Sequence, residues 1–94
     1  MTYYLEYIPK ALKKWNKLDL SIKKQFYKKL EERLSNPRIT KYKLRGYKNI
    51  YKIKLRSSGF RLVYEVKDEK IVILVLSVGK RENNKVYDDL EDII

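Results

Sequence analysis

The stretch NIYKIKLRSSGFRLVYEV, residues 49–66, decides the fold of this chain. Apolar and polar side chains alternate on both sides of its centre, with the period of two that is typical of β-strands. The glycine at the centre can adopt a positive φ, which favours a two-residue turn at Ser58–Gly59 between strands over 49–56 and 60–66. The stretch therefore predicts a β-hairpin.

The two faces of this predicted hairpin differ in chemistry. The turn implies a register that pairs Arg56 with Arg61 and Lys54 with Val63, which places Lys54 diagonal to Arg61. One face then carries only apolar and aromatic residues: Tyr51, Ile53, Leu55, Phe60, Leu62, Tyr64 and Val66. The other face carries Lys52, Lys54, Arg56, Arg61 and Glu65, and the apolar Val63 interrupts this polar set. We expect the first face to pack against a core.

A strand and a first helix are expected before the hairpin. Tyr3–Ile8 alternates weakly and is rich in tyrosine, which favours a strand. Proline suits the first turn of a helix, so Pro9–Leu18 is predicted to be helical, with Leu12 and Trp15 on one face.

A second helix is expected to follow directly. Asp19 is a candidate N-cap, and the helix should stop near Ser35 because Pro37 disfavours helical geometry at Asn36. Its apolar residues recur every four positions: Ile22, Phe26, Leu30 and Leu34. The two helices form a helical hairpin whose apolar faces need a sheet to cover.

The region after the hairpin predicts one more strand and a short helix. Ile71–Val78 is almost continuously apolar, as in a strand buried on both faces, and Gly79 is expected to end it. Val86–Ile94 is expected to form a short acidic helix. The predicted fold class is α+β, with an N-terminal strand, a helical hairpin, a three-stranded antiparallel meander and helices on one sheet face. Residues 1–94 are expected to form a single domain.

The charge of the chain points to a polyanionic partner. The 94 residues hold 23 Lys and Arg against 12 acids, a net charge of +11. Ten of these cations, and no acid, lie between Arg33 and Tyr64. Such a block favours affinity for nucleic-acid phosphates, although a charge run can also be a solvated face. No apolar stretch approaches the roughly 20 residues of a membrane helix, the start does not resemble a signal peptide, and cysteine is absent, so we expect a cytoplasmic protein.

The residues that are missing narrow the possible chemistry. With no His and no Cys, a histidine-based nucleophilic triad or a typical zinc site cannot form. Paired carboxylates for Mg²⁺ would need acids that the basic block lacks. RNA cleavage by this chain would therefore use Lys, Arg and Tyr, with the ribose 2′-hydroxyl as the nucleophile. Crowded like charges make a lysine a better base, because they disfavour its protonated form.

Lys52, Lys54, Arg56 and Arg61 are the candidate residues for such chemistry, with Arg81 at a neighbouring strand end. Alternating lysines are also what the solvent-facing side of a strand looks like. The gathering of four cations on one face favours phosphate binding over that interpretation. Tyr87 could stack on a base, or it could pack its ring on the sheet edge.

The sequence resembles the RelE toxins of the RelE/ParE toxin superfamily over essentially its whole length. The matching segments are Lys43–Gly46, Tyr51–Tyr64, Ser77–Glu82 and Tyr87. Phe60 stands where these toxins usually have a tyrosine. The resemblance implies a microbial RNase-like fold and an enzyme that cuts mRNA in the ribosomal A site. Attack by the 2′-hydroxyl would leave a 2′,3′-cyclic phosphate and a 5′-hydroxyl, with no cofactor and no metal.

The resemblance also implies roles for single residues. Lys52 or Lys54 would be the base, and Arg61 would stabilise the charge of the transition state. Arg81 would support the scissile phosphate or the leaving oxygen, and Tyr87 would stack on or orient the nucleotide. Arg45 and Arg56 are the expected RNA-binding residues; they would grip the phosphates of the message or of ribosomal RNA.

The expected partners are mRNA, the ribosome and a cognate antitoxin that wraps the toxin and displaces Val86–Ile94; no membrane is involved. Two other functions remain open. A ParE-like toxin would poison DNA gyrase without nuclease chemistry, although the Lys/Lys/Arg/Arg/Tyr set argues against it. A non-catalytic RNA-binding module would use the same basic face only to hold phosphates.

Overall fold

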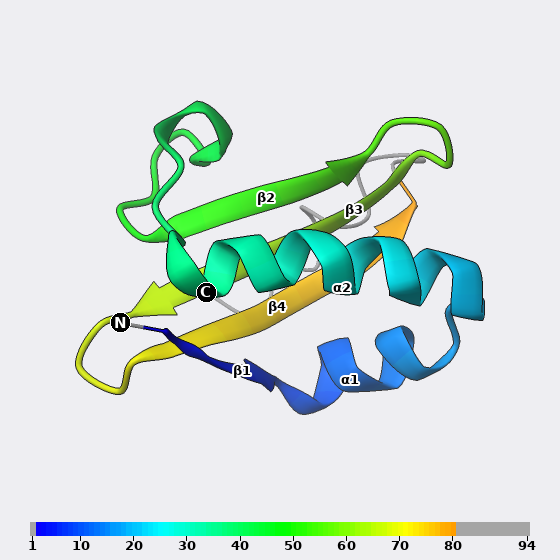
Figure 1. The fold of residues 1–94 in the computed structure, drawn as a ribbon, viewed down its shortest axis with the longest axis horizontal. Helices are drawn as coiled ribbons and strands as arrows, with labels where there is room; N and C mark the ends of the chain where they lie inside the picture. Colours follow the sequence, from blue (N-terminus) through cyan, green and yellow to red (C-terminus); the bar gives the residue numbers. More distant parts are fainter. Residues whose placement is uncertain (1, 81–94) are drawn as a thin grey trace.

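The computed structural model describes residues 2–80 of the chain and has the predicted α+β architecture (Figure 1). The predicted C-terminal helix, Val86–Ile94, lies outside the described residues. In chain order the elements are β1 (Tyr4–Tyr7), α1 (Pro9–Asn16), α2 (Leu20–Ser35), the 3-10 helix η1 (Thr40–Tyr42), β2 (Ile50–Leu55), β3 (Phe60–Lys67) and β4 (Val72–Lys80). All elements that were predicted within the described residues are present, and η1 is an addition.

The four strands form one sheet in the order β1-β4-β3-β2. β3 pairs antiparallel with both β2 and β4, as predicted, and β1 runs parallel to β4. β4 lies inside the sheet, which explains its nearly continuous apolar sequence. The prediction that Gly79 ends this strand is wrong: Gly79 pairs with Arg61, and β4 continues to Lys80.

Both helices cover the same face of the sheet (Figure 1). α1 begins with Pro9 in its first turn, as predicted, and ends at Asn16. Asp19 does occupy the N-cap position of α2, but its side chain makes no capping hydrogen bond. The apolar stripe of α2 is buried at Ile22, Phe26 and Leu30.

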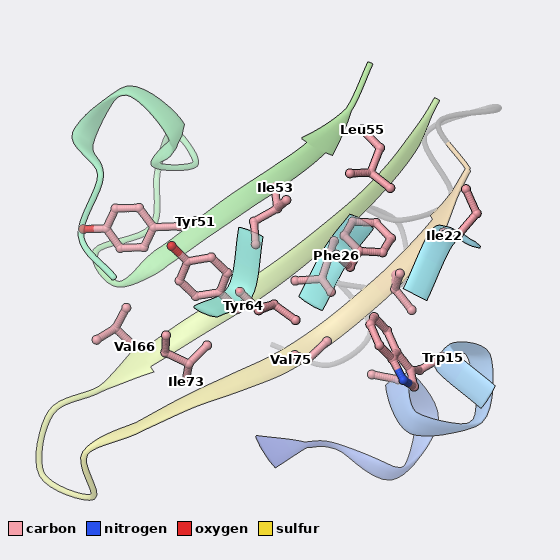
Figure 2. Packing of buried hydrophobic residues seen from close by; sticks show 14 residues of the cluster. Trp15, Ile22, Phe26, Tyr51, Ile53, Leu55, Tyr64, Val66, Ile73 and Val75 are labelled. Carbon is pink, nitrogen blue, oxygen red and sulfur yellow. The ribbon is translucent and has the colours of Figure 1, made fainter. Parts of the chain in front are cut away.

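The main core lies between the helices and this sheet face (Figure 2). Trp15 of α1 packs against both α2 and β1, since its ring centroid is 5.9 Å from that of Phe26 and 5.4 Å from that of Tyr7. The sheet contributes side chains from three strands: Tyr51, Ile53, Leu55, Leu62, Tyr64, Val66, Ile73, Val75 and Val78. The predicted apolar face of the hairpin is therefore the core face, although Phe60 is only half-buried.

The register of the hairpin differs from the predicted one by two residues. β2 ends at Leu55, which pairs with Phe60, so residues 56–59 form a four-residue connection instead of a two-residue turn. The Gly59 N–H donates to the Leu55 carbonyl at 2.9 Å, and Gly59 has the positive φ of 75° at the last position of the loop. A shift by two keeps every side chain on its face, but it brings Lys54 directly opposite Arg61.

The opposite face of the sheet is not entirely polar. Val63 is fully buried there and packs with Ile50 and Leu76 in a second, smaller cluster. The register between β3 and β4 shifts between Val63 and Tyr64, because Val63 pairs with Ser77 and Tyr64 with Val75. Leu76 is thus the extra residue of a β-bulge. Along the hairpin, this apolar cluster lies between the Lys54–Arg61 pair and the β3–β4 turn.

Candidate active site

Lys54 and Arg61 form the centre of the candidate site. They are a directly opposed pair of the β2–β3 ladder, and both side chains are half-buried. Side chains at opposed positions have Cβ atoms about 5 Å apart, so the two cationic groups can reach one small ligand together. Lys52 lies two residues earlier on the same strand face, roughly 7 Å away along the strand, and faces Val63 across the ladder.

A hollow of about 220 Å³ lies beside this pair. It is lined by Lys54, Leu55, Arg56, Gly59, Phe60 and Arg61, which are the ends of β2 and β3 and the loop between them. Arg56 was predicted on the strand face, but it lies in the loop and is exposed. The loop nevertheless places Arg56 at the hollow with Lys54 and Arg61, so three predicted site residues meet at one place.

A larger groove, of about 580 Å³, runs between α2 and the free edge of β2. Its lining includes three of the predicted residues, Lys52, Lys54 and Arg56. The remaining lining residues were not predicted as site residues: Gln25, Lys29, Arg33, Lys41, Tyr42, Leu55 and Ser57. No acid of the described residues lines either hollow.

Sequence reasoning missed this groove although a signal was present. Gln25, Lys29 and Arg33 are spaced four apart, so they share one side of α2. Arg33 also lies three residues after the buried Leu30, which turns its side chain toward the sheet. The predicted stripe continued to Leu34, but Arg33 is the buried residue, at 7% exposure, and Leu34 is half-buried.

Arg33 is held by neutral groups. Its Nη1 donates to the Tyr64 hydroxyl at 2.9 Å and to the Lys52 carbonyl at 3.3 Å, and the guanidinium lies 4.8 Å from the Tyr42 ring centroid. The Tyr64 hydroxyl donates in turn to the Pro37 carbonyl at 2.7 Å. Burial raises the pKa of Tyr64, while the hydrogen bond from Arg33 opposes this shift. The phenol therefore stays protonated as a donor.

The remaining predicted site residues are Arg45, Arg81 and Tyr87. Arg45 is exposed in the loop before β2 and lines neither hollow. Arg81 and Tyr87 lie outside the described residues. The described chain ends next to the smaller hollow, because Gly79 pairs with Arg61 and Lys80 with Phe60.

The arrangement is suited to binding and stabilising a phosphodiester. Clustered Lys and Arg side chains stabilise negative charge that develops on phosphate oxygens, and a lysine among them can accept a proton. Among residues 2–80, no three His, Cys, Asp or Glu side chains gather closely enough to hold a metal ion. No helix in the same part of the chain is long and apolar enough to cross a membrane.

Comparison with known proteins identifies the family. Residues 5–85 match the family described as ParE toxin of type II toxin-antitoxin system, parDE. The mRNA interferase toxin RelE of Escherichia coli K12 is 55% identical over 89 residues, covering 95% of this chain and 94% of that protein. The mRNA interferase RelE of Shigella flexneri matches with the same identity and coverage.

This chain is also similar to solved structures of RelE toxins. The free E. coli toxin RelE, as an arginine-to-alanine double variant, has a TM-score of 0.90 at 52% identity, with full coverage of both chains. The toxin of the intact E. coli RelBE toxin–antitoxin complex has a TM-score of 0.82 at 56% identity, covering 86% of this chain and 99% of that one. The fold and the resemblance to RelE are thereby confirmed, and this chain belongs to the ParE toxin family of type II toxin–antitoxin systems, within the RelE/ParE superfamily.

Proposed function

We propose that this chain is the toxin of a type II toxin–antitoxin system and an mRNA interferase, a ribosome-dependent endoribonuclease that inhibits translation. The observation that carries the proposal is the opposed pair Lys54 and Arg61, which shares with Arg56 a hollow that no acid of residues 2–80 lines. The 55% identity to proteins named mRNA interferase RelE supports the same activity. The chain would act in the cytoplasm, where ribosomes are, with residues 1–94 as one toxin domain.

The proposed reaction is cleavage in the ribosomal A site by the ribose 2′-hydroxyl. Lys52 or Lys54 removes the hydroxyl proton, and the oxygen attacks the adjacent phosphorus. The bond to the 5′-oxygen breaks, which leaves a 2′,3′-cyclic phosphate, and the departing oxygen takes a proton from water to become a 5′-hydroxyl. Arg61 stabilises the pentacovalent phosphorus, so the protein's cations supply the positive charge and no metal is required.

The proposal also assigns roles to the remaining candidate residues. In the proposal, Arg81 supports the leaving oxygen, Tyr87 orients the nucleotide, and Arg45 and Arg56 hold flanking phosphates. Arg81 acts by charge and not by giving up a proton, because a guanidinium stays protonated. The ribosome is needed to align the nucleophile, since the protein has no strong general base.

We also propose that a cognate antitoxin binds this chain and displaces Val86–Ile94. The relative E. coli RelE forms a complex with its antitoxin RelB, and this chain resembles the toxin of that complex. An antitoxin encoded beside the gene for this chain should relieve the growth arrest that expression of the toxin causes. Growth arrest that this antitoxin leaves unchanged would contradict the proposal.

A translating cell extract tests the activity. We expect the parent chain to cut mRNA within codons, and Arg61→Ala to cut about 10²–10³-fold more slowly, as for loss of one charge-stabilising group. Lys70→Ala, which removes an exposed lysine from the β3–β4 turn, is the matched control and should cut normally. A ParE-like toxin would leave mRNA intact and stop gyrase instead. A non-catalytic RNA-binding module would neither cut mRNA nor stop gyrase.

A further inference from the structure

Within the described part of the chain, the buried charge of Arg33 has no carboxylate paired with it. The hydrogen-bond partners of Arg33 are a carbonyl and a hydroxyl, and they use only Nη1 of its guanidinium. Among residues 2–80, no carboxylate forms an ion pair with Arg33. A charge that is withdrawn from water is costly unless it is paired or well hydrogen-bonded. An anion in the adjoining groove would provide the missing pairing.

The groove around Arg33 is built from further cations. Lys29 of α2 and Lys41 of η1 are exposed, and neither forms an ion pair with a carboxylate of the described residues. The strand side contributes Lys52, Lys54 and Arg56. Glu32 does not line the groove but borders a neighbouring hollow on α2, which shares Lys29 with it. Six cationic side chains therefore line one groove, with a buried and positioned guanidinium among them.

We propose that the groove between α2 and β2 is a second phosphate-binding site, which holds the RNA strand next to the point of cleavage with Arg33 as its buried ligand. This inference rests on the proposed function, because it assumes that the strand being cut is RNA. Lys54 and Arg56 line both the groove and the smaller hollow, so one strand can pass from the first to the second. A planar guanidinium matches phosphate oxygens in a bidentate manner.

The first test measures binding without cleavage. The probe is a short single-stranded RNA with every 2′-hydroxyl methylated, which keeps the phosphates but cannot undergo the proposed attack. The variant is Lys29→Gln with Lys41→Gln, and the control is Lys13→Gln with Lys24→Gln, which removes two exposed lysines that line neither hollow. Each phosphate contact on a single strand adds about 0.7 to the slope of log affinity against log salt.

We expect the groove variant to lower that slope by about 1.4 and the control to leave it unchanged. Equal slopes for the two double variants would overturn the proposal. A second possible result is that the groove variant binds the RNA normally but loses binding of a polyaspartate peptide. That result would also overturn it and would assign the groove to an acidic protein segment.

Arg33→Met separates binding from a structural role. Tyr64 would keep its hydrogen bond to the Pro37 carbonyl, and a buried charge would be replaced by an apolar chain of similar length. We expect the melting temperature to stay the same or rise while RNA affinity falls. Parental affinity in a folded Arg33→Met chain would contradict the proposal. If the variant does not fold, the exposed Lys29 and Lys41 still decide the question.

The result of the RNA-binding tests is independent of the result of the cleavage assay. If the parent chain cuts mRNA in the extract but the groove variant binds RNA like its control, only the groove assignment is wrong. If the parent chain does not cut mRNA, the proposed function is wrong, whatever the methylated RNA shows.

Discussion

Lys52 and Lys54 have different neighbours, although they lie on the same strand face. Lys54 has Arg61 directly across the ladder, whereas Lys52 faces the apolar Val63 and its carbonyl accepts a hydrogen bond from Arg33. The two lysines therefore lie in different surroundings, which fits a division of roles between charge stabilisation and proton acceptance. Arginine is a useful replacement, because it keeps the charge and cannot act as a base near neutral pH.

We predict that Lys52→Ala and Lys54→Ala both slow codon cleavage, and that the arginine variants identify the base. At the position of the base, arginine should be as slow as alanine, with a loss of about 10²–10⁴-fold. At the other position, arginine should retain most of the activity. Single-turnover cleavage of ribosome-bound mRNA measures this. If both arginine variants cut at the parental rate, neither lysine is the base.

At the scale of elements, the loop between β2 and β3 determines how Arg56 meets the Lys54–Arg61 pair. Gly59 closes this loop with a φ of 75°, a conformation that costs an L-residue about 1–2 kcal/mol. A Cβ at this position would have no heavy atom within 4 Å, so only backbone strain opposes a side chain there.

We predict that Gly59→Ala lowers the free energy of unfolding by about 1–2 kcal/mol, the cost of the left-handed conformation. Gly59→Asn should lose less, because asparagine tolerates this conformation better than alanine. Urea denaturation measures both. An alanine variant as stable as the parent would mean that the loop adopts another backbone path, and cleavage should then change because Arg56 would move.

The elements were largely predictable because each depends on local periodicity. Alternation in residues 49–66 assigned the two faces of the hairpin, and an error of two residues in register left those faces unchanged. The length of the loop was not predictable, because a glycine at positive φ fits both a two-residue turn and the last position of a longer loop. The predicted start of the last strand, Ile71, instead has a φ of 55°, a conformation that is rare for a β-branched residue.

The candidate site was predictable only where one element carries it. Lys52 and Lys54 share a face of one strand, and simple alternation finds them. The groove forms only because α2 and β2 lie side by side, and no local pattern in the sequence predicts the distance between these two elements. Arg33 illustrates the limit, since its burial depends on Tyr42 and Tyr64, which come from two other elements.

At the scale of the whole molecule, Asp68 joins three distant segments. Its carboxylate accepts hydrogen bonds from the Tyr3 hydroxyl, at 2.7 Å, and from Arg38, which also donates to Asn49 at 2.8 Å. The β3–β4 turn is thereby tied to the start of the chain and to the segment after α2. The hydrogen bond from Tyr3, followed by the one from Arg38, lowers the pKa of Asp68 below its usual 3.8.

This shift predicts a pH dependence of stability. A carboxyl group whose pKa is lower in the folded state stabilises that state above its unfolded pKa, and the effect is lost as pH falls through the folded pKa. We expect the melting temperature of the parent to fall more steeply below about pH 4 than that of Asp68→Asn. Thermal unfolding monitored by circular dichroism gives both curves, and parallel curves would show that these hydrogen bonds add no stability.

The parallel pairing of β1 with β4 has a consequence for how the protein is made. Tyr4–Tyr7 leaves a translating ribosome well before its hydrogen-bonding partner, residues 72–75. Until that partner is synthesised, the first strand has no ladder to join and α1 lacks β4, the strand that it mainly contacts. A message interrupted before the codon for Val72 therefore yields a polypeptide that cannot complete this sheet.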